Sequence, residues 1–196
     1  MKRILSLAVL ALMAAPGAAL AHTGVGATHG LVHGLMHPLT GLDHVLAMVA
    51  VGVLAATLGG RAIWLIPASF VAMAGLGGLV GVSHLALPGV EAGIAVSVIV
   101  LGLVVALQPR LPLAASVAMV GLFGLYHGFA HGVEMPADAA GLAYGIGFLG
   151  ATIALHLGGI GLGLGINILG ARPAHRLAQV GGTVMAAVGI VLLIGT

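Results

Sequence analysis

The stretch from residue 112 to residue 133 reads PLAASVAMVGLFGLYHGFAHGV, and it contains no Asp, Glu, Lys or Arg. A helix that crosses a membrane needs about 20 mostly apolar residues, so this stretch is long enough to span one. Five more segments have the same character, at about 35–58, 62–83, 91–107, 140–165 and 176–195. Gly and Pro punctuate the short connections between them. The sequence therefore predicts an all-α fold, a polytopic bundle of six transmembrane helices.

The composition of the whole chain points to lipid as its solvent. Of the 196 residues, 61% are hydrophobic and only 5% are charged, and 34 are glycine. Soluble domains carry about 25% charged residues and about 7% glycine, so a soluble domain is excluded. A disordered chain is excluded too, because disorder goes with low hydrophobicity and high charge. The sequence holds no cysteine, which rules out disulfides, thiolate metal sites and a cysteine nucleophile.

The amino terminus has the pattern of a secretory signal. Lys2 and Arg3 precede an apolar run, and Ala19-Leu20-Ala21 forms a small-residue cleavage site. We expect a signal peptide over 1–21, a histidine-containing periplasmic segment over 22–34 and the six-helix transmembrane domain over 35–196. The alternative is an uncleaved first helix. Without residues 1–21 the net charge is zero, so the basic balance of the full chain gives no argument for nucleic acid as a partner.

The arginines predict the orientation in the membrane. All four that follow the signal lie in the first, third and fifth connections: Arg61, Arg110, Arg172 and Arg176. Positive residues favour the cytoplasmic side. The mature amino terminus is therefore expected in the periplasm, with the chain crossing the inner membrane several times.

Glycines recur every four residues on two of the predicted spans. Gly124, Gly128 and Gly132 do so on one, and Gly77 and Gly81 on another. Small residues at this spacing let two helix backbones approach closely in lipid. We expect them to serve helix packing.

The first predicted span opens with a polar cluster. His37 is followed by Asp43 and His44, with Met48 one turn further along. Charged and titratable groups inside a span are costly and usually face the bundle interior or an aqueous cavity. In a regular helix His37 and His44 share a face but lie about 10.5 Å apart along the axis. That distance is too long for both to bind one metal ion.

A second polar cluster closes the span that reads YHGFAHGVE at its end. His127 and His131 stand at i and i+4, and Glu134 returns to the same face. Two imidazoles at this spacing can clamp one divalent ion, and the carboxylate compensates charge. A proton relay is the alternative, because the same groups also carry protons.

Other polar residues are weaker candidates for a metal pathway. His22, His29 and His33 precede the first span, where histidine-rich tracts can capture metal. Glu91 lies at the start of a predicted helix, where a carboxylate also suits the helix dipole. His156 lies deep in the fifth span and is either a later waypoint or a histidine satisfied by a neighbouring helix.

The types of ligand limit which metal ions the site is expected to bind. Imidazole and carboxylate suit Ni²⁺, Co²⁺, Zn²⁺ or Cu²⁺, whereas Mg²⁺ and Ca²⁺ prefer shells of oxygen. We expect the metal as a transported ion and no permanently bound cofactor.

These two clusters resemble the signatures of the HupE/UreJ family of nickel permeases. The first signature, a histidine, five residues and Asp-His, is matched by His37, Asp43 and His44. The second reads Phe-His-Gly-x-Ala-His-Gly-x-Glu and is matched by His127, Gly128, Ala130, His131, Gly132 and Glu134, with Tyr126 in place of the phenylalanine. Leu87 to Glu91, Ile94 and Ser97 also resemble the family. The resemblance implies metal uptake for nickel enzymes such as hydrogenase or urease in bacteria, although some members are thought to take other metals.

We therefore predict a secondary permease and not an enzyme. The amino-terminal histidines would capture the ion and His37 would guard the entry. The central site would comprise Asp43, His44, His127, His131 and Glu134, with the two carboxylates offsetting the charge of the ion. Membrane lipid and the ion are the expected partners, and association into a homo-oligomer is left open. The alternatives are an intramembrane zinc hydrolase that acts on lipid, with Ser69 and Ser97 as polar helpers, and a non-transporting accessory protein.

Overall fold

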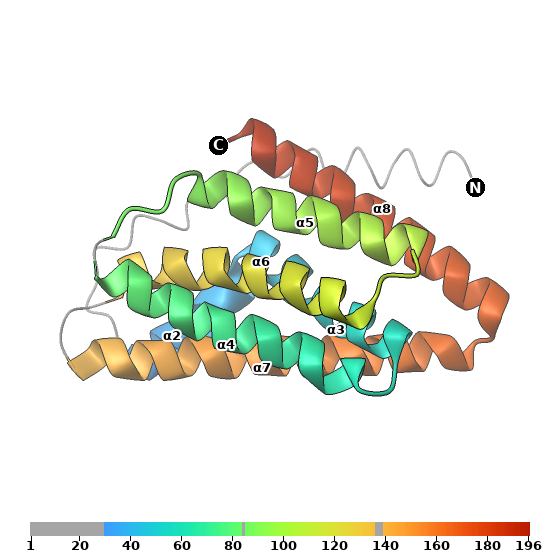
Figure 1. Ribbon diagram of the computed structural model, residues 1–196, viewed down its shortest axis with the longest axis horizontal. Helices are drawn as coiled ribbons and strands as arrows, with labels where there is room; N and C mark the ends of the chain where they lie inside the picture. The colour runs from blue at the N-terminus through green and yellow to red at the C-terminus, as the bar shows by residue number, and fades with distance from the viewer. Residues whose placement is uncertain (1–29, 84, 136–138) are drawn as a thin grey trace.

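The computed structural model describes residues 30–83, 85–135 and 139–196, and these residues form helices joined by short connections (Figure 1). The helices are α2 (Gly30–Thr40), α3 (Leu42–Leu58), α4 (Ala62–Val82), α5 (Val90–Leu107), α6 (Leu113–Val133), α7 (Ala139–Ile168) and α8 (Ala171–Ile194). No strand occurs in the part of the chain that the structure describes. The expected signal peptide over 1–21 and the histidines at 22 and 29 lie outside these residues.

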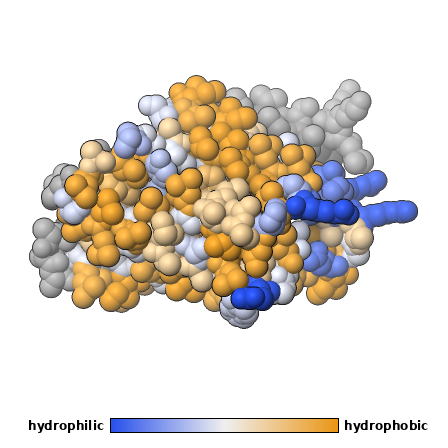
Figure 2. All heavy atoms as spheres, in the orientation of Figure 1, coloured by the Kyte–Doolittle hydropathy of each residue, from blue (hydrophilic) through white to orange (hydrophobic). Residues whose placement is uncertain are grey.

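The helices confirm the expected all-α membrane fold. The five from α4 to α8 contain segments that are long and apolar enough to cross a membrane, and the bent pair of α2 and α3 supplies a sixth span if it is counted as one. The side chains that face outward are largely apolar, as Figure 2 shows for one face. Leu79, Leu107 and Leu142 are examples, with exposed fractions of 70%, 70% and 73%.

The first span differs from the continuous helix expected over 35–58. It begins at Gly30 and is broken at Gly41 into α2 and α3, whose axes differ by 80°. Gly41 has extended backbone angles, φ −82° and ψ 115°, and serves as the N-cap of α3. A Cβ on Gly41 would lie 2.9 Å from the Oδ1 atom of Asp43 and 3.1 Å from the Nδ1 atom of His44. The bend therefore occurs where two polar side chains fold back over a residue that has no side chain.

The glycine stripes pack helices together, as predicted. A Cβ on Gly128 would overlap the carbonyl oxygen of Ala74, and one on Gly124 would overlap that of Phe70. Because both contacts join α6 to α4, these two helices lie side by side and parallel. Helix α5 packs along α8 in the same close manner, and α7 packs along α2 and α3 (Figure 1).

The four arginines lie at one end of the bundle, but Arg172 and Arg176, expected in the fifth connection, belong to the start of α8. The α3–α4, α5–α6 and α7–α8 connections gather there, and the α4–α5 and α6–α7 connections lie at the opposite end (Figure 1). The arginine end is defined here by Arg61, Arg110, Arg172 and Arg176. This arrangement fixes a direction along the bundle against which the polar residues can be placed.

Candidate metal centre

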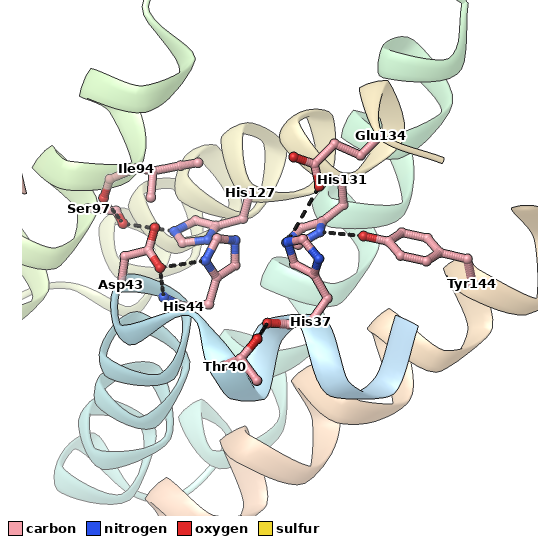
Figure 3. A network of polar contacts seen from close by, with 10 residues as sticks. All are labelled: His37, Thr40, Asp43, His44, Ile94, Ser97, His127, His131, Glu134 and Tyr144. Atoms are coloured by element: carbon pink, nitrogen blue, oxygen red, sulfur yellow. Dashed lines mark hydrogen bonds and ion pairs between the residues drawn. The ribbon is translucent and has the colours of Figure 1, made fainter. Parts of the chain in front are cut away.

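The two polar clusters of the sequence meet inside the bundle. His37 comes from α2, His44 from the first turn of α3, and His127 and His131 from the last two turns of α6 (Figure 3). The break at Gly41 is what brings them together. It places the rings of His37 and His44 6.5 Å apart between centroids, in contrast to the separation expected in a regular helix.

Three ligand groups form what we call the triad: His37, His131 and Glu134. One ligand atom from each residue lies within 4.8 Å of the other two. The Nε2 atom of His37 lies 3.4 Å from the Oε2 atom of Glu134. The His37 and His131 rings are 4.7 Å apart. Two imidazoles and one carboxylate suit a divalent transition metal. The triad lies on the side of the site that faces away from the arginine end.

His44 is held by the carboxylate beside it. The Oδ1 atom of Asp43 accepts a hydrogen bond from the backbone N–H of His44 and lies 2.8 Å from its Nδ1 atom. A carboxylate accepts, so Nδ1 carries the proton and Nε2 carries the lone pair. Nε2 is buried with no hydrogen-bond partner among the described residues. A carboxylate that orients a histidine in this way is the usual arrangement behind a metal ligand.

His127 is held by Ser97 of α5. The Ser97 hydroxyl donates to the carbonyl oxygen of Ile94 at 2.6 Å, so its single proton is used there. Its oxygen lies 2.9 Å from the Nε2 atom of His127 and must accept that N–H. The lone pair of His127 is therefore on Nδ1, which has no hydrogen-bond partner among the residues described. His44 and His127, which we call the pair, thus each keep one ring nitrogen for a ligand.

The rings form a continuous file. Centroid distances are 5.6 Å from His33 to His37, 4.7 Å from His37 to His131, 4.6 Å from His131 to His44 and 4.7 Å from His44 to His127. The first ring of the file is exposed, whereas His127 is fully buried. Steps this short allow a small ion to keep some ligands while it exchanges others. The triad and the pair are therefore neighbouring stations within one site.

Two residues of the site were not foreseen in the roles that the structure gives them. The hydroxyl oxygen of Tyr144 lies 3.0 Å from the Nδ1 atom of His131, and Tyr144 is only 1% exposed. Ser97 was named for its resemblance to the family and as a polar helper of a hydrolase, whereas here it orients His127. The only sequence signal for Tyr144 is its rarity, since the chain contains two tyrosines.

The remaining sequence candidates fall at different distances from the centre. His33 lies on α2 with its ring 5.6 Å from that of Tyr144. Met48 is fully buried in the apolar core, and Glu91 is exposed in the first turn of α5. His156 is buried beyond the pair. Asp43 contacts His44, so the two carboxylates expected in one central site are divided between the triad and the pair.

Comparison with known proteins now adds to this geometry. Residues 10–192 match the family described as HupE / UreJ protein. The chain belongs to the HupE/UreJ family. It is also 44% identical to Protein HupE of Rhizobium leguminosarum bv. viciae over 186 residues, which cover 95% of each chain. No solved structure matches the chain.

Membership of the HupE/UreJ family confirms the resemblance drawn from the two histidine motifs. Both motifs lie within the matched residues, and both contribute side chains to the centre described above. The family and the several apolar helices together identify a multi-pass membrane protein.

Proposed function

We propose that this HupE/UreJ protein is a secondary permease that carries a divalent transition-metal ion, with nickel as the favoured cargo, across the bacterial inner membrane. The ion would enter from the periplasm and supply nickel enzymes such as hydrogenase or urease. The observation that carries the proposal is the adjacency of the triad and the pair, with ring nitrogens of His44 and His127 left for a ligand.

The charge of the site supports an ion as the cargo. A divalent cation loses its hydration on entering a bundle of apolar helices, and ligands with negative charge must compensate. Glu134 supplies one such charge in the triad, and Asp43 supplies another behind the pair. Imidazole ligands exchange, so binding can be tight enough for entry and still permit release.

The placement of the site supports a direction of transport. His33, exposed on α2, is the first ring of the file, and the buried pair is further toward the arginine end. Positive side chains favour the cytoplasmic face of a membrane. An ion would accordingly pass from His33 through the triad to the pair.

The test is uptake of radioactive Ni²⁺ into liposomes that contain the purified protein, with Co²⁺, Zn²⁺ and Cu²⁺ as competitors and with or without a pH gradient. We expect His131→Ala to reduce the initial rate at least tenfold. The matched control is His175→Ala, which removes an exposed histidine of α8 at the arginine end. Equal uptake by both variants, or no uptake by the unmodified protein, would contradict the proposal. Release of fatty acid from the liposome lipid would favour the hydrolase instead.

A further inference from the structure

The file of aromatic rings continues past the pair toward the arginine end. Phe70 of α4 lies with its ring centroid 5.5 Å from that of His127 and 5.1 Å from that of His156 on α7. Phe70 is fully buried, and its ring meets the His156 ring at 87°. One apolar ring therefore separates the pair from another imidazole.

His156 is buried in a way that packing alone does not explain. It is 1% exposed, and neither of its ring nitrogens has a hydrogen-bond partner among the residues described. Burying a polar group without a partner is unfavourable, so an apolar side chain of the same size would serve packing better. The sequence also allowed His156 to be a histidine whose ring is hydrogen-bonded to a neighbouring helix. That alternative needs a hydrogen-bond partner, and the described residues do not supply one.

His156 lies between the pair and two cavities at the arginine end. Its carbonyl oxygen packs against Gly52 of α3, which is eight residues or about 12 Å along the helix from His44. A cavity of about 190 Å³ is lined by α3, α5, α7 and α8, and it includes Asn167, eleven residues beyond His156 on α7. A second cavity of about 260 Å³ shares Gln108 with the first and reaches Arg110.

We propose that His156 is the inner transfer ligand of the permease: its imidazole takes the metal ion from the pair, past Phe70, and passes it to the cavities at the arginine end. The inference rests on the proposed function and adds a residue to it. The alternation of ligand, apolar ring and ligand would let the ion advance only when the side chain of Phe70 turns aside. A single imidazole holds a divalent ion weakly, which suits a step that leads to release.

The first experiment replaces His156 with leucine and measures Ni²⁺ uptake into liposomes together with the melting temperature. We expect uptake to fall at least tenfold, while the melting temperature stays equal or rises because an unpaired polar group has been removed from the core. The control is Thr152→Val, one turn away on α7, which is equally buried and whose hydroxyl is satisfied by the carbonyl oxygen of Phe148. Undiminished uptake by His156→Leu would overturn the inference, and so would a lower melting temperature, which would assign His156 to packing.

The second experiment uses the absence of cysteine from the sequence. His156→Cys introduces a single thiol, and thiolate prefers soft ions. We expect Cd²⁺ to protect this thiol from a maleimide reagent and to compete with Ni²⁺ for uptake more strongly than it does in the unmodified protein. A thiol that reacts equally fast with and without Cd²⁺ would overturn the inference. Failure of the unmodified protein to transport any ion would instead refute the proposed function, so the two failures are distinct.

Discussion

Replacing Ser97 with alanine removes one oxygen atom from the centre and no metal ligand. The Ser97 hydroxyl accepts the Nε2–H of His127 and so keeps the lone pair on Nδ1. Without that acceptor, the proton can reside on either ring nitrogen. The tautomer with the proton on Nδ1 cannot bind a metal ion through that atom.

The size of the effect follows from two contributions. A buried N–H group that loses its acceptor costs about 1–3 kcal/mol. Loss of a group that orients a metal ligand weakens metal affinity by about 10- to 100-fold. A factor of 10 to 100 corresponds to about 1.4–2.7 kcal/mol, so the two figures agree. We expect the half-saturating Ni²⁺ concentration for uptake to rise by about this factor in Ser97→Ala.

The matched control is Ser116→Ala on α6. Ser116 is also fully buried and its hydroxyl also donates to a backbone carbonyl, that of Pro112, but no histidine is bonded to it. The difference between the two variants therefore isolates the contact with His127. The assay is initial Ni²⁺ uptake over a range of concentrations, with melting temperatures recorded for both proteins. If both variants reach half-saturation at the same concentration, the assignment of the His127 tautomer is wrong.

Three further changes test the parts of the site and of the fold. Gly41→Ala would displace the Asp43 carboxylate, which orients His44. Ni²⁺ binding measured by titration calorimetry should therefore weaken about tenfold. Unchanged affinity would contradict the role of the bend in positioning the ligands. Gly128→Ala should lower the free energy of unfolding by about 1–3 kcal/mol, and with it the melting temperature, because α4 and α6 must separate. Gly75→Ala should leave the melting temperature unchanged because the added Cβ has open space around it. Glu134→Gln should weaken Ni²⁺ binding at least tenfold by removing the charge of the triad, and equal calorimetric affinities would exclude Glu134 as a ligand.

The helical class, the position of the spans and the packing faces rich in glycine could be predicted from the sequence because these depend on local signals. Length and hydropathy locate spans that cross lipid, and Gly or Pro marks the connections. The four-residue spacing of Gly124 and Gly128 identifies the face on which α6 meets another helix, because only a missing side chain permits such close approach. The pattern does not name the partner helix, and it was the structure that identified α4.

The bend at Gly41 could not be predicted because a single glycine does not distinguish this position from the many other glycines of the chain. The sequence contains 34 glycines, most of which lie in helices without breaking them. The roles of Ser97 and Tyr144 were also beyond reach, since they depend on how α5 and α7 are rotated about their own axes. A hydrogen bond between His127 and a residue 30 positions away leaves no trace in spacing. The ligand types and the meeting of the two clusters were therefore predictable from the sequence, whereas the division of the ligands into a triad and a pair was not.

The division of the carboxylates has a consequence for how many ions the site can hold. Glu134 belongs to the triad and Asp43 to the pair, so each station has one negative charge for a divalent ion. Two divalent ions held at these neighbouring stations would repel each other strongly, because the surrounding helices are apolar and screen charge poorly. One carboxylate per station offsets only part of that repulsion. Under the proposed function the file therefore holds one ion at a time, and equilibrium dialysis should find one Ni²⁺ per chain. A second ion of equal affinity would show that the stations are independent and that transfer between them is not the mechanism.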